Sequence, residues 1–169
     1  SSSFVLIEAL GLSRLGYGAV MAVGSVIYIA GTVACRRLLV RWGLTRTVAA
    51  AGGVTCAAGL AMAALALIGW GQPWYGAWAV VLPQWLFILA HGVHQPVSQS
   101  GAVAPFPHMA GAASALNGFV MMAAAFPMGL WLGSALDGTP RALALGFGAW
   151  CLVIALTAWV LVRRYGEPR

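Results

Sequence analysis

Residues 47–69 read TVAAAGGVTCAAGLAMAALALIG and contain no charged side chain. A run of about 20 apolar residues is long enough to cross the ~30 Å hydrocarbon core of a bilayer as a helix. Similar apolar blocks recur along the chain, and short polar segments separate them. The sequence therefore predicts an all-α membrane protein with five full transmembrane helices, at about residues 17–35, 47–69, 75–93, 109–131 and 142–162.

The composition of the whole chain agrees with membrane insertion. Of the 169 residues, 62% are hydrophobic and 7% are charged, and the mean hydropathy is +0.90. A soluble domain carries about 25% charged residues. Because so few charges cannot form a water-soluble surface, the lipid bilayer is the expected surroundings of this chain.

The placement of the arginines decides between a membrane and a nucleic acid as the partner of this basic chain, whose formal net charge is +6. Most of them form two clusters, Arg36, Arg37, Arg41 and Arg46 after the first predicted span and Arg163, Arg164 and Arg169 after the last. This asymmetry follows the positive-inside rule and predicts a multi-pass protein with a cytoplasmic C-terminus. Nucleic-acid binding would need a basic face on a soluble module, so we expect no nucleic-acid partner.

Three of the predicted spans carry a stripe of polar or polarisable side chains. The stripes are Met21, Ser25, Tyr28 and Thr32 in the first span, Gln84, Ile88, His91 and Gln95 in the third, and Ser114, Asn117 and Met121 in the fourth. Steps of three and four residues place each set on one face of a helix. Lipid offers polar side chains no partner, so such a face turns toward protein or a water-filled cavity. The stripes therefore predict either a cavity wall or hydrogen bonds between helices in a bundle without a cavity.

The two remaining spans lack a polar stripe. The last span is almost wholly apolar. The second presents a row of small residues at a spacing suited to close helix contact, namely Gly52, Cys56, Gly59 and Ala63. We expect both spans to support the bundle from outside.

Few residues inside the spans can carry chemistry. The three carboxylates fall in predicted loops or tails, at Glu8, Asp137 and Glu167. Intramembrane Asp or Glu residues are the usual proton carriers, so this chain alone is expected to lack a proton relay. His91 and His94 are three residues apart, but zinc needs three or four well-placed ligands. We interpret His91 and Gln95 as residues at the inner mouth of a cavity.

Enzyme chemistry finds no support in the motifs. The chain lacks the His-Glu-x-x-His and Gly-x-Ser-x-Gly patterns of metalloproteases and serine hydrolases. Its three cysteines have neither a disulfide framework nor a zinc spacing. We therefore expect a protein that is not an enzyme and that binds no metal or other cofactor.

Two neighbouring segments carry a family resemblance. Residues 95–103 read QPVSQSGAV and residues 106–118 read FPHMAGAASALNG. They resemble the loop and the start of helix 11 in the Bcr/CflA drug-resistance transporters of the major facilitator superfamily, whose pattern is Phe-Pro, a polar step, then Ala-Gly-x-Ala-Ser-x-Leu-x-Gly. More weakly, Arg41, Gly43 and Arg46 resemble the degenerate second copy of the superfamily's cytoplasmic loop motif, without its acidic position.

The resemblance implies the architecture and the function. The start of the chain is similar to the end of helix 7, and the five spans would be helices 8–12 of a twelve-helix transporter. Residues 1–169 would then be a partial C-terminal transmembrane bundle, cut from a longer chain and lacking its N-terminal bundle. The family exports drugs or small metabolites across the bacterial inner membrane in exchange for protons, so an antiporter is implied, with the proton-carrying residues in the missing half.

The expected site combines this resemblance with the polar stripes. Tyr28, Gln84, Asn117 and Met121 are the predicted wall of a cavity for a small drug-like substrate, in which amide and phenol groups orient the substrate and the thioether makes adaptable apolar contact. Two alternatives remain: a non-transporting membrane assembly subunit, and a solute importer of the same superfamily, since a fold does not fix a function.

Overall fold

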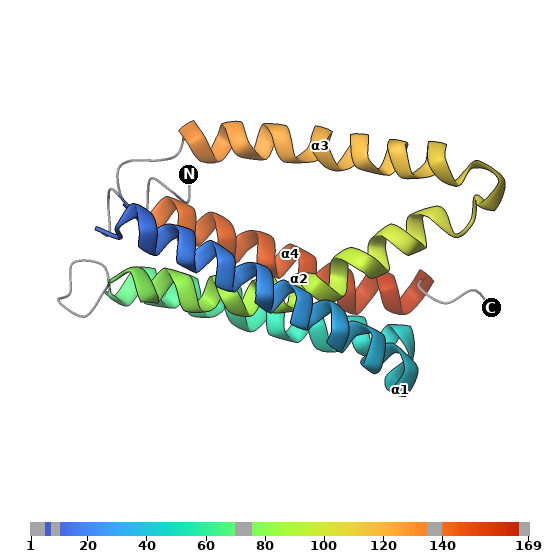
Figure 1. The fold of residues 1–169 in the computed structure, drawn as a ribbon, viewed down its shortest axis with the longest axis horizontal. Coiled ribbons are helices and arrows are strands. Elements are labelled where there is room, and N and C mark those ends of the chain that lie inside the picture. Colours follow the sequence, from blue (N-terminus) through green and yellow to red (C-terminus); the bar gives the residue numbers. More distant parts are fainter. Residues whose placement is uncertain (1–5, 8–10, 70–75, 135–139, 166–169) are drawn as a thin grey trace.

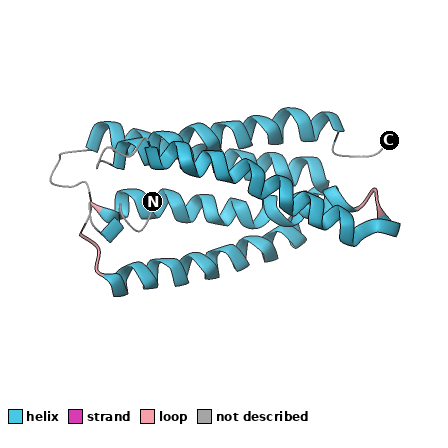
Figure 2. Cartoon of the chain, turned by 90° about the horizontal axis from the view of Figure 1, so that it is seen from above, coloured by secondary structure: helices cyan, strands magenta, loops and turns pink. Residues whose placement is uncertain are grey.

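A computed structural model describes residues 6–7, 11–69, 76–134 and 140–165 of the chain. Its elements are α1 (Arg14–Gly69), α2 (Ala77–Val103), the short 3-10 helix η2 (Pro107–Met109), α3 (Ala110–Ser134) and α4 (Pro140–Tyr165). The four long helices are each long and apolar enough to cross a membrane. They run roughly along one direction, and the described regular structure is entirely helical (Figure 2). The predicted all-α membrane bundle is confirmed.

Helix α1 contains two of the predicted spans. It breaks at Gly43, where φ is 75° and ψ is 177°. This backbone conformation is open almost exclusively to glycine. Figure 1 shows the chain reversing direction there, so that an N-terminal half (residues 14–42) and a C-terminal half (residues 44–69) form a helical hairpin. Gly43, which belongs to the resembled loop motif, therefore makes the reversal of the chain possible.

Helix α2 continues well beyond residue 93, where the third span was expected to end. It runs to Val103 and includes Pro96 in its interior. A proline removes only one helical hydrogen bond, and the hydroxyls of Ser98 and Ser100 donate to backbone carbonyls one turn earlier at 3.0 and 3.1 Å. Most of the segment that we expected to be an interhelical loop is therefore helical.

Glycines allow α1 to lie close to its neighbours. A Cβ added at Gly59 would overlap the side chain of Cys151 in α4. A Cβ added at Gly31 would overlap the carbonyl oxygen of Leu89, and one at Gly92 would lie 2.6 Å from the carbonyl oxygen of Tyr28. The predicted close contact through Gly59 is thus confirmed, and a second one joins α1 to α2.

Tryptophan side chains add hydrogen bonds across the same two interfaces. The Trp85 indole of α2 donates to the Val20 carbonyl in the N-terminal half of α1 at 3.2 Å. The Trp159 indole of α4 donates to the Ala49 carbonyl in the C-terminal half at 3.0 Å. A buried apolar cluster lies between the helices and comprises Leu6, Val20, Met62, Ala66, Ala77, Val80, Val81 and Ala144. Helices α1, α2 and α4 therefore form one packed unit.

Helix α3 stands apart from this unit over most of its length (Figure 1). In its most apolar stretch no residue is buried, and large side chains such as Leu116, Phe119 and Phe126 are 64%, 70% and 70% exposed. It contacts α2 and α4. These contacts lie toward its two ends, as the side-chain interactions below show.

Most of the basic residues of the described chain gather at one end of the bundle. The break in α1, the turn between α2 and α3 and the end of α4 lie together at that end (Figure 1). The first arginine cluster flanks the break, and Arg163 and Arg164 occupy the last turn of α4. Arg14 begins α1 and Arg141 lies in the first turn of α4, both at the opposite end. The charge asymmetry expected from the sequence is therefore an asymmetry between the two ends of the fold.

Candidate functional site

The polar face of α2 is the centre of the candidate site. Gln84, His91 and Gln95 share this face, and each of them is half-buried. Helix α1 reaches the face at His91, and α3 reaches it near the end of the helix. The two other segments with polar stripes, the N-terminal half of α1 and α3, thus both contact α2.

His91 lies between aromatic rings from two helices. Its ring is stacked on that of Phe87, with centroids 5.6 Å apart and planes at 17°. On α1 the Tyr28 ring is 6.0 Å away and tilted by 46°. Phe87 in turn meets the edge of Phe147 on α4 at 5.0 Å. Within the described part of the chain the imidazole of His91 makes no hydrogen bond, so aromatic contacts alone hold it.

His94 is held differently. Its Nε2 is 3.2 Å from the hydroxyl oxygen of Thr55, a fully buried residue in the C-terminal half of α1. A buried hydroxyl needs such a partner, since an unpaired polar group in an apolar interior costs about 1–3 kcal/mol. His94 therefore helps to join α2 to α1, and its Nε2 is occupied by this contact.

A groove runs between α2 and α4 and contains two adjoining cavities. The first, of about 350 Å³, has a polar wall on α2 that consists of His91, His94, Gln95 and Ser98. Opposite this wall it is lined by apolar and aromatic side chains of α4, including Trp150, Val153 and Ile154. We call the two cavities together the α2–α4 groove.

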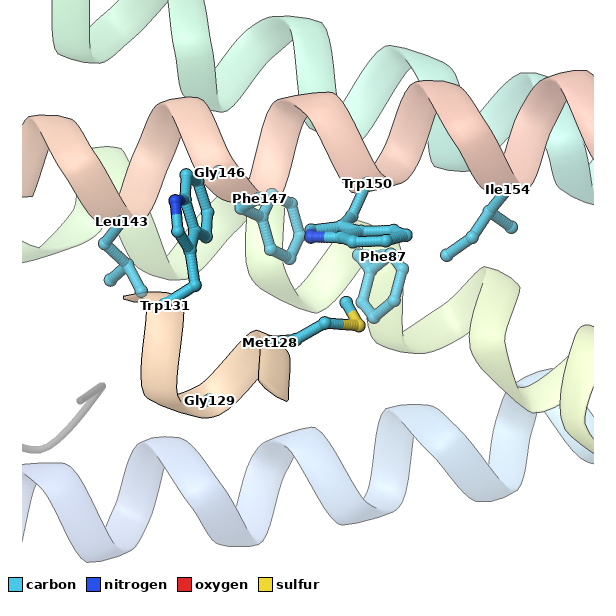
Figure 3. Close-up of a pocket in the computed structure, with 9 residues that line it drawn as sticks. All are labelled: Phe87, Met128, Gly129, Trp131, Leu143, Gly146, Phe147, Trp150 and Ile154. Atoms are coloured by element: carbon cyan, nitrogen blue, oxygen red, sulfur yellow. The ribbon is translucent and has the colours of Figure 1, made fainter. Parts of the chain in front are cut away.

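The second cavity, of about 360 Å³, is almost wholly apolar. Phe87, Trp150 and Ile154 line both cavities and connect them. Figure 3 shows Met128 and Trp131 of α3 pointing into this part of the groove, toward the aromatic side chains of α2 and α4. The C-terminal end of α3 therefore closes one side of the groove.

The N-terminal half of α3 is bound to α2 by a small polar cluster. The Asn117 amide donates to Oε1 of Gln99 at 2.8 Å. The Gln99 amide lies 3.8 Å from the Met121 sulfur, and the Asn117 amide lies 3.9 Å from it. Two predicted site residues, Asn117 and Met121, thus lie together beside Gln99, which was not predicted from the sequence. Gln99 continues the stripe of α2 by one more step of four residues, a signal that the assumed loop concealed.

The remaining predicted residues take separate positions. Gln84 lies roughly 22 Å before Gln99 along the axis of α2, at 1.5 Å per residue, and its amide makes no hydrogen bond within the described chain. The polar stripes of α2 and α3 therefore meet at Gln99 and not at Gln84. Arg41 and Arg46 are exposed on either side of the break at Gly43.

The groove presents a concave, mostly apolar surface with a few polar side chains. No Asp or Glu occurs among the described residues, and among them no three metal-ligating side chains gather. A concave, mostly apolar surface with a few convergent polar groups is typical of sites for small organic molecules. The described part of the chain is thus a multi-pass α-helical membrane bundle, and aromatic side chains line much of its groove.

Comparison with known proteins gives one partial match. The chain is 40% identical to Multidrug resistance protein D of Escherichia coli (strain K12) over 55 residues, which are 31% of this chain and 14% of that protein. The match therefore spans a small part of the relative's length. No family model matches the chain. No solved structure matches it either.

Proposed function

We propose that this chain is part of a multidrug or small-molecule efflux transporter and that the α2–α4 groove forms part of the surface that its substrates contact. The observation that carries the proposal is the groove itself, in which aromatic side chains of α2, α3 and α4 adjoin the polar group of His91 and Gln95. Hydrophobic drug-like molecules need an apolar surface with few orienting polar groups. The partial likeness to a multidrug resistance protein supports the same function.

The finer assignment follows from the family resemblance. The Phe-Pro and Ala-Gly-x-Ala-Ser-x-Leu-x-Gly pattern at residues 106–118 supports a Bcr/CflA antiporter. Its partners would be an N-terminal bundle, which rocks against this one around a central site, and the protons that drive export. The basic end of the bundle supports a cytoplasmic C-terminus in a bacterial inner membrane.

Transport is favoured over the rival functions by where the polar side chains point. In an assembly subunit the polar stripes would serve only as hydrogen bonds between helices. Here Asn117 makes such a bond, but His91 and Gln95 line a cavity. A solute importer would bind polar substrates, for which the almost wholly apolar second cavity is poorly suited. These features favour transport of hydrophobic molecules over a purely structural role and over import of polar solutes.

Binding of a hydrophobic cationic dye tests this function. Trp150 lines both cavities, whereas Trp42, beside the break in α1, lines neither. Ethidium should bind the chain in lipid nanodiscs, and Trp150→Leu should weaken the binding about fivefold, because one aromatic contact contributes about 1 kcal/mol. Trp42→Leu should leave the affinity unchanged. Absence of ethidium binding, or an equal loss in both variants, would refute the proposal.

A further inference from the structure

We propose that His91 is a reversible proton-binding site inside the membrane and that its proton comes from the basic end of the bundle. The use of this proton in export rests on the proposed function, whereas the proton binding itself does not. The sequence alone had placed the proton-carrying residues outside this chain. The structure instead gives one histidine the surroundings that such a site requires.

The first requirement is a free imidazole that faces a cavity. His91 lines the 350 Å³ cavity and makes no hydrogen bond within the described chain. His94 lines the same cavity, but its Nε2 is engaged by Thr55 at 3.2 Å. Imidazole is the side chain that changes charge most readily near neutral pH. His91 can therefore take a proton from cavity water on either ring nitrogen, whereas His94 already uses its Nε2 to bind Thr55.

The second requirement is stabilisation of the cation that forms. Rings whose centroids lie within about 6 Å of a cation attract it through their electron-rich faces. Phe87 is stacked at 5.6 Å from the His91 ring, and Tyr28 approaches it at 6.0 Å from α1. These contacts replace part of the hydration that an imidazolium would have in water.

No other charge compensates the site within the described chain. The titratable groups that face His91 are the Tyr28 phenol of α1 and His94 of its own helix. The α4 residues that line the cavity carry no titratable group, Val48 is the one cavity residue from the C-terminal half of α1, and α3 contributes none. Repulsion between two nearby cations disfavours double protonation. The pair therefore binds one proton, which we assign to His91 because its ring nitrogens make no hydrogen bond within the described chain and its ring contacts Phe87 and Tyr28.

The route to His91 is open on one side. Gln95 and Ser98 line the cavity on the next two turns of α2, toward the end where the α1 break and the end of α4 lie. Polar side chains of this kind order bridging water. In the other direction the cavity beyond Phe87 is almost wholly apolar. A hydronium ion reaching the cavity transfers its proton to a ring nitrogen and leaves a water molecule, so the step needs no other reactant.

A proton on His91 would disfavour a cationic substrate in the same groove. Binding of the two is then linked, and each lowers the affinity for the other by the same factor. Exchange of a proton for a hydrophobic cation at one site is the elementary event of an antiporter. The groove would in this way contribute to coupling as well as to substrate contact.

Histidine NMR of the whole chain in nanodiscs tests the proton site without any substrate. With ¹⁵N-labelled histidine in a His108→Gln background, which removes the exposed histidine of η2, one imidazole should change from neutral to cationic as the pH falls from 8 to 5, and His91→Gln should remove that signal. His94→Gln is the matched control and should leave the transition in place. In Phe87→Leu the transition should move to lower pH, since one stabilising ring is lost. A His91 signal that stays neutral down to pH 5, or a transition that Phe87→Leu does not move, would overturn the proposal.

Ethidium binding then separates this inference from the proposed function. Acidification from pH 8 to pH 6 should weaken ethidium binding to the unmodified chain by about threefold or more, through linkage, and should have little effect on His91→Gln. An equal pH effect in both chains would show that His91 does not couple the two ligands. Loss of all ethidium binding with a normal NMR titration would refute the substrate groove and leave the proton site standing.

Discussion

Two amides illustrate, at the scale of single residues, what a polar stripe can mean. Asn117 and Gln84 were both predicted to face one cavity. Asn117 instead donates to Gln99 across the α2–α3 contact, while the Gln84 amide has no hydrogen-bond partner within the described chain. Asn117 thus follows the second of the alternatives considered for the stripes, a hydrogen bond between helices. Sequence spacing identifies the face of a helix but not the depth at which it meets its neighbour.

Leucine substitutions should separate these two roles. Asn117→Leu removes an interhelical hydrogen bond and should lower the free energy of unfolding by about 0.6 kcal/mol, the average for such bonds in membranes. Gln84→Leu breaks no hydrogen bond and should leave stability nearly unchanged. Unfolding of the purified chain by sodium dodecyl sulfate, followed by circular dichroism, measures both. A larger loss in Gln84→Leu than in Asn117→Leu would contradict the hydrogen-bond assignment.

The helix contacts show, at the scale of elements, which features the sequence made predictable. The small residues around Gly59 predicted a close approach, because few arrangements other than packing explain such spacing. The contact between Gly31 and Gly92 was not predicted, because both glycines lie in helices whose clearest sequence pattern is a polar stripe. The extension of α2 was missed because Pro96 suggests an end more often than an interior position. Local chemistry predicted the spans but not the point where α2 ends.

Alanine at two glycines of the same half of α1 tests the α1–α4 contact. Gly59→Ala brings a methyl group into Cys151 and should destabilise the chain by about 1–3 kcal/mol, as overpacking does. Gly53→Ala meets nothing within 4 Å and should be neutral or slightly stabilising, because alanine favours a helix more than glycine does. Thermal unfolding in detergent compares them. Equal midpoints for the two variants would show that the contact is not as close as described.

The reversal at Gly43 can be tested in the same manner. A side chain at φ 75° and ψ 177° is strained by about 1–3 kcal/mol. Gly43→Ala should therefore lower stability, whereas Gly18→Ala, which also lies in α1 and has open space around it, should not. If Gly43→Ala were as stable as the unmodified chain, the hairpin would not depend on this glycine.

The basic end of the bundle determines the expected orientation of the whole molecule. Positive side chains favour the cytoplasmic side during insertion, so the break in α1 should lie inside and the start of α1 outside. Val40 and Leu15 are 89% and 86% exposed near these two ends. In intact cells an impermeant maleimide should label Leu15→Cys and not Val40→Cys. The unmodified chain provides the background, and the opposite pattern would reverse the topology.

The whole molecule also explains why the groove was not predictable as such. The sequence predicted Tyr28, His91 and Gln95 as cavity residues, and His91 and Gln95 do line a cavity. The opposite wall, formed by Trp150 and Ile154, belongs to a span that was expected to be an outer support. Apolar wall residues leave no periodic signal in an apolar helix, so only the position of α4 across the groove from α2 reveals them.

Photoaffinity labelling tests the central claim most directly, namely that the α2–α4 groove binds hydrophobic organic molecules. An azido derivative of ethidium, photolysed with the chain in nanodiscs and mapped by mass spectrometry, should attach to residues of α2 and α4 that line the groove, around His91 and Trp150. Excess unlabelled ethidium should abolish this labelling. Attachment spread over the exposed faces of α3, or labelling that unlabelled ethidium does not reduce, would contradict the account.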